Sequence, residues 1–212
     1  MYAVLKKLKP HKPIILLFVV ALVVRFIGIQ HGFPFIFHPD EPAVVRSATG
    51  IRFNPNPGHF DWPHLYFYLN YFVFTIFIKI RGLVQILGLQ SVLASKLPLL
   101  WQDPLVFYFL SRSLSAFMGA LTVVPIYLAG KELFNKKAGY LSALALTFMP
   151  FHAHTSHFAL IDVPTAFWVS LAIYFSVRVF NGGELKDYLL AGLFVGFAAS
   201  TKYHGGLIAV MV

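Results

Sequence analysis

The sequence contains no cysteine, so disulfide bonds, thiolate catalysis and cysteine-ligated metal centres are excluded. Acidic residues are also scarce, because the 212 residues include 8 Asp and Glu against 17 Lys and Arg. The resulting net charge of +9 would suit a nucleic-acid partner, but the basic residues fall between long apolar runs. That distribution is typical of cytoplasmic loops in membrane proteins. We therefore predict a lipid bilayer as the partner, and no nucleic acid.

Hydrophobic residues make up 58% of the chain, whereas soluble domains contain about 45–50%. The basic start and the apolar run that follows it resemble a secretory signal peptide. However, Gly28-Ile29-Gln30 is a poor cleavage site, and the run at residues 14–30 is about as long as a membrane span. We interpret it as an uncleaved first span, with the N-terminus in the cytoplasm because lysines precede it.

The rest of the chain continues the pattern of apolar runs and basic loops. Further spans are predicted near residues 106–130, 138–156, 163–180 and 188–201. We place in the cytoplasm the basic residues that separate these spans, namely Lys131, Lys136, Lys137, Arg178 and Lys186. The predicted fold class is thus all-α: a polytopic transmembrane helix bundle, multi-pass in the cell (inner) membrane. The same alternation places residues 31–63, Asp162 and Lys202 outside.

Two segments on the outer side need separate treatment. Residues 42–49 are predicted to form a short helix that starts at Pro42, with Asp40 or Glu41 as its cap. Residues 64–100 must cross the membrane either not at all or twice for the alternation to hold. We favour an interfacial or re-entrant segment, because nearby aromatic residues suit the headgroup belt; the alternative is a pair of short crossings. These aromatic residues are Trp62, Tyr66, Tyr68 and Tyr71.

A carboxylate pair, Asp40-Glu41, directly follows the first span, and short motifs then occur in a fixed order. They are residues 61–69 (DWPHLYFYL), 111–116 (SRSLSA), 127–134 (YLAGKELF), 158–164 (FALIDVP), 191–197 (AGLFVGF) and 201–203 (TKY). Together they resemble the N-terminal half of a glycosyltransferase of the C superfamily, in the branch of protein O-mannosyltransferases and aminoarabinose transferases. The resemblance covers nearly the whole chain. It departs at His64, where the family often has a second proline after Pro63.

The resemblance implies a fold and an activity. Such enzymes transfer a sugar, with inversion, from a polyprenyl-phosphate donor to a lipid, glycan or protein acceptor on the outer face of the membrane. They are usually much longer than this chain, which ends within the apolar run 207–212. We therefore expect residues 1–212 to be the N-terminal part of a multi-span glycosyltransferase domain, and to be inactive alone.

Three carboxylates are the predicted catalytic groups. Transfer to a hydroxyl or amine needs an ionised carboxylate that takes the acceptor proton. The resemblance favours Asp40 as this base, Glu41 as its support and Asp162 as a second carboxylate across the same outer cavity. The alternative is helix capping, by Asp40 or Glu41 before Pro42 and by Asp162 before residues 163–180.

Two cations are predicted to bind the donor phosphate, which leaves as an anion and would be stabilised by a fixed positive charge. They are Lys202 and Arg112; the alternatives are a snorkelling lysine and a plain interfacial anchor. The predicted substrate-binding residues are His38, Trp62, His64, Tyr203 and His204.

Three clustered histidines are weak candidates for metal ligands. His152, His154 and His157 could bind a divalent metal together with Asp162. The favoured alternative is a set of interfacial polar residues at the end of a span. Some relatives use a divalent ion and others do not, so a metal cofactor stays open and no other cofactor is predicted.

Two other functions would place the same charges differently. In a transporter, Asp40, Asp162 and Lys202 would line an ion or substrate path, but transporters usually hold such charges near the membrane midplane and show internal repeats. A non-catalytic membrane subunit could keep the fold and bind a donor without turning it over.

Overall fold

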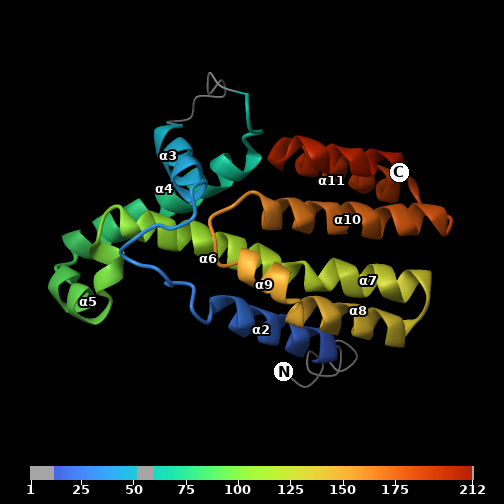
Figure 1. The fold of residues 1–212 in the computed structure, drawn as a ribbon, viewed down its shortest axis with the longest axis horizontal. Helices are drawn as coiled ribbons and strands as arrows, with labels where there is room; N and C mark the ends of the chain where they lie inside the picture. Colours follow the sequence, from blue (N-terminus) through green and yellow to red (C-terminus); the bar gives the residue numbers. More distant parts are fainter. Residues whose placement is uncertain (1–11, 52–59, 212) are drawn as a thin grey trace.

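The computed structural model describes residues 12–51 and 60–211. Within these residues all regular secondary structure is helical, as predicted, and most helices lie along one common direction (Figure 1). The bundle comprises α2 (Lys12–Phe26), α6 (Leu105–Leu121), α7 (Val123–Leu133), α8 (Lys136–Phe148), α10 (Asp162–Phe180) and α11 (Leu185–Thr201). The 3-10 helix η3 (Tyr203–Met211) then packs against α10 and α11.

Three helical segments among the described residues are long and apolar enough to cross a membrane: Leu65–Ile86, Leu105–Leu133 and Asp162–Phe180. The second of these is α6 and α7 together, and the break between them falls at Thr122. Pro125 accounts for the break, since it has no N–H to offer the carbonyl four residues earlier. Helix α2 is apolar but shorter.

The predicted span at residues 138–156 is divided in the structure. Helix α8 ends at Phe148, and a short helix α9 (Pro150–Thr155) follows. Proline at position 150 supplies no N–H to the carbonyl of Leu146. Arg25 of α2 fills this gap: its Nη2 donates to the Leu146 carbonyl at 3.1 Å and its Nη1 to the Thr147 carbonyl at 3.3 Å. Arg25, in the last turn of α2, is therefore fully buried and lies against the end of α8.

Helices α7 and α8 form a close antiparallel hairpin. Asn135 caps α8, because its side-chain oxygen accepts from the backbone N–H groups of Lys137 and Ala138, both at 3.0 Å. Gly130 and Gly139 face each other where the two backbones approach. A Cβ at Gly139 would lie 2.5 Å from the carbonyl oxygen of Tyr127, so only glycine allows this packing.

We expect Gly139→Ala to destabilise the hairpin by about 1–3 kcal/mol, because the added methyl meets backbone atoms that cannot rotate away. The matched control is Gly192→Ala in α11, where an added Cβ has no neighbour within 4 Å. That control should be neutral or stabilising by up to about 1 kcal/mol, since alanine favours a helix. Unfolding in detergent micelles, followed by loss of helical signal, distinguishes the two; equal effects would contradict the close approach.

The segment between α2 and α6 covers the first half of α6. It contains α3 (Glu41–Gly50), α4 (Leu65–Ile86), α5 (Gln90–Lys96) and the 3-10 helix η2 (Pro98–Trp101). Helix α4 continues through two basic residues, Lys79 and Arg81. Arg81 can lie within the helix because it forms a two-point ion pair with Asp103 at 3.0 Å and stacks on Trp101.

Helix α4 is fastened to α6 by buried polar groups. The Tyr66 hydroxyl donates to the carbonyl of Ser111 at 3.1 Å, and Asn70 donates to the carbonyl of Tyr66 at 2.8 Å. Figure 1 shows α4 running back along the first half of α6. The length and composition of α4 would allow it to cross a membrane, so an interfacial position for residues 64–100 stays a prediction.

The two ends of the bundle differ in character. One end, which we call the site end, holds the start of α3, the start of α10 and the end of α11 (Figure 1). The opposite end, which we call the basic end, holds the turns after α7 and α10, where Asn181 donates to the carbonyl of Glu132 at 3.3 Å. The basic end carries Lys131, Lys136, Lys137, Arg178 and Lys186, the residues placed together in the cytoplasm from the sequence.

This separation predicts opposite labelling of the two ends. Single cysteines introduced at Arg46 in α3 and Lys137 in α8, both exposed, add the only thiols of the described chain. An impermeant maleimide added to intact cells should modify the cysteine at position 46, and should reach position 137 only after permeabilisation. Modification of both from the same side would contradict a bundle that spans the membrane.

Candidate functional site

A buried ion pair stands at the centre of the site end. The guanidinium of Arg112 donates from Nε to Glu41 Oε1 at 2.7 Å and from Nη2 to Glu41 Oε2 at 2.6 Å. The Glu41 side chain is 0% exposed and that of Arg112 2%. Two charges removed from water in this way are tolerated only with close pairing and further hydrogen bonds.

Both partners have those further bonds. Arg112 Nη1 donates to the carbonyls of Ile29 and His31, at 3.1 and 2.9 Å. The backbone N–H of Ala159 donates to Glu41 Oε1 at 2.9 Å. The pair thus fastens together the turns that follow α2, α3, α6 and the loop before α10.

This geometry changes how two predicted site residues are interpreted. Arg112, expected to bind the donor phosphate, is enclosed and fully engaged with Glu41 and two carbonyls, so it has no open face for a donor in this structure. Glu41, expected to support catalysis, is equally enclosed. Burial and pairing favour a scaffolding role for both, which acts on the site through the backbone segments that they hold.

Asp40, the neighbour of Glu41, lies in the opposite environment. It is exposed and occupies the N-cap position of α3, but its side chain makes no capping hydrogen bond. Its φ of −84° and ψ of −19° are helical, whereas a capping residue is usually extended. Its backbone N–H donates to His38 Nδ1 at 3.3 Å. The capping alternative therefore does not account for this carboxylate.

Asp162 and Lys202 meet at the same end of the bundle. Lys202 Nζ lies 2.7 Å from Asp162 Oδ1, and the two side chains are 38% and 48% exposed. Asp162 is the first residue of α10, with Ile161 as the N-cap, while Lys202 terminates α11 with extended backbone angles. A pair this exposed contributes little stability, so both groups are available to a ligand.

A cavity of about 360 Å³, which we call the histidine cavity, opens beside this pair. Its walls come from the loop before α3, from α9 and from the start of α10. It is lined by His38, Phe151, His154, Thr155, Phe158, Leu160 and Asp162. Asp40 adjoins it through the hydrogen bond between its backbone and the His38 ring. Two distant parts of the sequence, residue 38 and residues 151–162, therefore meet here, and they bring together His38 and Asp162 with His154, one of the weak metal candidates.

The three weak candidates for metal ligands, His152, His154 and His157, do not come together as one group. Among the described residues no three His, Asp or Glu side chains are grouped so that they could hold a metal ion. His152 Nδ1 lies 3.0 Å from Arg25 Nη2, so this nitrogen accepts from a cation and is turned away from the others. Burial, the largest cause, lowers the pKa of His157 below its usual value. His154 lines the cavity.

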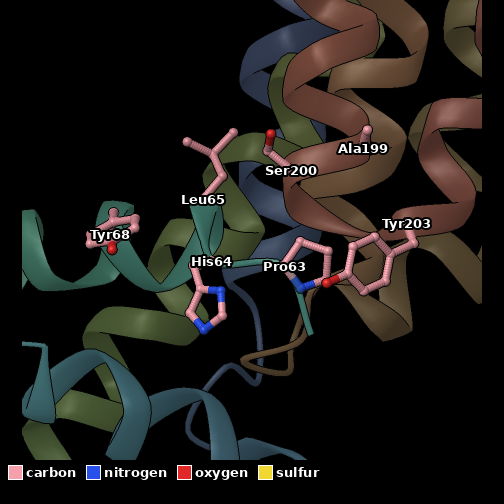
Figure 2. A pocket seen from close by; sticks show the side chains of 7 residues that line it. All are labelled: Pro63, His64, Leu65, Tyr68, Ala199, Ser200 and Tyr203. Carbon is pink, nitrogen blue, oxygen red and sulfur yellow. The ribbon is translucent and has the colours of Figure 1, made fainter. Parts of the chain in front are cut away.

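The remaining predicted substrate-binding residues lie outside the histidine cavity. Figure 2 shows a groove of about 540 Å³ between the start of α4 and the end of α11, lined by Pro63, His64, Leu65, Tyr68, Ala199, Ser200 and Tyr203. The Tyr203 hydroxyl donates to the carbonyl of Phe60 at 2.7 Å. Trp62 lines a separate hollow with Asp61 and Phe67. His204 is exposed on η3.

Sequence reasoning missed the aromatic walls of the histidine cavity. Phe158 lies between two imidazoles, with ring centroids 5.3 Å from His38 and 5.2 Å from His154. Phe151, 80% exposed, forms another wall. The signal was present, since both residues flank the histidine cluster, but a chain with 23 phenylalanines gives no means of selecting these two.

Comparison with known proteins gives a family for this geometry. The family model for dolichyl-phosphate-mannose-protein mannosyltransferase matches residues 108–212, from α6 to the end of the chain. The apolar helical bundle and this match define a membrane glycosyltransferase of the mannosyltransferase type. The match supports a glycosyltransferase of the C superfamily, the class that the motifs indicated. No curated protein and no solved structure matches it.

The two adjacent acids should respond in opposite ways to loss of charge. Glu41→Gln leaves the buried Arg112 without its counter-ion and should cost about 3–5 kcal/mol of stability, seen as aggregation or early thermal unfolding in detergent. Asp40→Asn is the matched control, because it removes a charge one residue away that is exposed and uncapped. Its unfolding should stay within about 0.5 kcal/mol of the parent. A stable Glu41→Gln variant would show that the ion pair does not hold the site end together.

Proposed function

We propose that the chain transfers mannose or a related sugar from a polyprenyl-phosphate donor to a lipid, glycan or protein acceptor on the outer face of the membrane. One observation carries the proposal: an exposed carboxylate, Asp40, adjoins the same cavity that the Asp162–Lys202 ion pair borders. Such a transfer needs a proton acceptor and a cation for the leaving phosphate. The family match supplies the class of reaction.

Asp40 acts as the general base in this proposal. The acceptor oxygen forms a bond to the anomeric carbon while the bond from that carbon to the phosphate oxygen breaks. Asp40 takes the proton of the acceptor hydroxyl, and the phosphate leaves with the bonding electron pair. Because the acceptor enters opposite the leaving group, the configuration at the anomeric carbon is inverted. Exposure suits Asp40 to this role, since an acceptor hydroxyl can reach its carboxylate.

Lys202 is the proposed partner of the leaving phosphate. Its ammonium group lies 2.7 Å from Asp162 Oδ1 in the structure. A phosphate at the rim of the histidine cavity would offer Lys202 a second anion, and the charge that develops on the leaving oxygen would strengthen that contact in the transition state. Asp162 then keeps Lys202 in place before the donor arrives.

The groove between α4 and α11 is the proposed place for the first isoprenyl units of the donor. It is lined largely by apolar and aromatic side chains, and Tyr203 in its wall directly follows Lys202 (Figure 2). A carrier whose phosphate meets Lys202 could therefore lay its chain along Pro63, Leu65 and Tyr68 without leaving an apolar surface.

The proposed orientation has the site end outside. Support comes from the basic end, since the positive-inside rule places loops rich in Lys and Arg in the cytoplasm. The same distribution speaks against a transporter, whose charged groups would follow a path across the membrane. Arg25, in the last turn of α2, lines no such path: it is fully buried and donates to backbone carbonyls of α8.

Asp40→Asn tests the proposed base. Turnover of a polyprenyl-phosphate-mannose donor, measured in membranes that carry the full-length protein, should fall by about two to four orders of magnitude. Donor binding should change little, because asparagine keeps the size of the side chain. Asp162→Asn serves as a comparison. It should weaken donor binding as well as turnover, since Asp162 no longer holds Lys202 in place for the phosphate. If Asp40→Asn turns over donor at a near-normal rate, Asp40 is not the base.

A further inference from the structure

The histidine cavity carries more recognition chemistry than the proposed reaction needs. Proton transfer and phosphate binding use Asp40 and Lys202, yet two imidazoles, a hydroxyl and aromatic rings also line the hollow. Both imidazole rings are held against Phe158, at centroid distances of 5.3 and 5.2 Å. A few fixed polar groups on an otherwise apolar and aromatic wall are typical of pockets for small molecules.

The tautomer of His38 follows from its hydrogen bond. Its Nδ1 accepts from the backbone N–H of Asp40 at 3.3 Å, so the ring proton of a neutral imidazole lies on Nε2. Nε2 can then donate to a hydroxyl oxygen while the Asp40 carboxylate next to it stays free to take a proton. The hydrogen bond thereby couples the direction of the His38 ring to the backbone of the proposed base.

The opposite wall is held by buried charges. Helix α9 carries His154, and Arg25 fixes the start of this helix through hydrogen bonds to the end of α8 and to His152. Phe158 is braced from beneath, since the guanidinium carbon of Arg112 lies 5.8 Å from its ring centroid. The cavity walls are therefore set by the same groups that hold the fold, so the positions of the two imidazoles are fixed before a ligand arrives.

We propose that the histidine cavity binds the sugar ring of the donor, and that His38 and His154 are specificity-determining residues that read its hydroxyl groups. The inference rests on the proposed function and deepens it. A volume of about 360 Å³ lies near the lower limit of roughly 300 Å³ for small-molecule pockets, which suits one sugar ring rather than an oligosaccharide. Asp162, in the wall of the cavity, brings Lys202 to the side where the sugar-linked phosphate would lie.

Two probes separate recognition of the sugar from recognition of the carrier. The first is a polyprenyl phosphate without sugar, and the second is the same carrier with a mannosyl group; binding of each to the protein in lipid nanodiscs is measured. His154→Ala and His38→Ala should each weaken binding of the mannosyl carrier about three- to tenfold, the equivalent of one net hydrogen bond. Neither should change binding of the sugar-free carrier. Lys202→Gln should weaken both probes.

His31→Ala is the matched control, because this exposed histidine does not line the cavity and only its backbone carbonyl is used by Arg112. It should bind both probes as the parent does. Equal losses of both probes in the cavity variants would overturn the sugar site, and so would unchanged binding of both. A parent protein that binds neither probe, or a Lys202→Gln variant that binds both normally, would instead refute the proposed function.

Deoxy donors give a second measurement that is independent of how stable the variants are. Suppose that His154 contacts one hydroxyl of the sugar. The donor that lacks this hydroxyl should then bind the parent protein about as weakly as the complete mannosyl carrier binds the His154→Ala variant. The variant should lose nothing further with that deoxy donor, because the interaction is already absent. The proposal would fail if, for every deoxy donor, the loss of binding from His154→Ala simply added to the loss from the missing hydroxyl. That result would show that His154 contacts no sugar hydroxyl.

Discussion

A carboxylate and a guanidinium that are both removed from water stabilise a fold only when their hydrogen bonds to water are replaced by hydrogen bonds within the protein. Glu41 and Arg112 meet this condition through two short hydrogen bonds to one another and through three backbone groups. Those backbone groups belong to the turns that follow α2 and to the loop before α10. The pair therefore sets the distance between the segments that carry the proposed base and the walls of the cavity, and the rest of the site end depends on it.

Adjacent positions in the sequence serve opposite purposes here. Helical geometry at the start of α3 turns Glu41 inward to Arg112 and leaves Asp40 exposed, although the two side chains have the same chemistry. A buried acid without a partner would become neutral and could not accept a proton readily. The pairing of Glu41 thus anchors the backbone, while the exposed side chain of Asp40 stays accessible to a ligand. Glu41 therefore holds the backbone in place, and Asp40 has no capping bond that a ligand would have to break.

Much of this arrangement was predictable from the sequence. The apolar runs and the basic loops between them predict the bundle. They also predict that Asp40, Asp162 and Lys202 lie at one end of it, because the alternation of spans and loops depends only on local composition. The pairing of Arg112 with Glu41, 71 positions earlier, was not predictable, since a guanidinium suits a phosphate as well as a carboxylate. The break at Pro150 also escaped prediction: its repair comes from Arg25, a residue 121 positions away from Leu146.

The two arginines show how a membrane bundle can use charge without exposing it to lipid. Arg25 donates to carbonyls at the end of α8, and Arg112 joins Glu41 to the carbonyls of Ile29 and His31; the charged groups of both are held by buried partners. A cation bound in this way gains nothing from an incoming phosphate, because it would first have to give up partners that are buried with it. Lys202, with a single exposed partner, would give up little. Among these three cations, the cost of releasing existing contacts therefore selects Lys202 as the one that can respond to a donor.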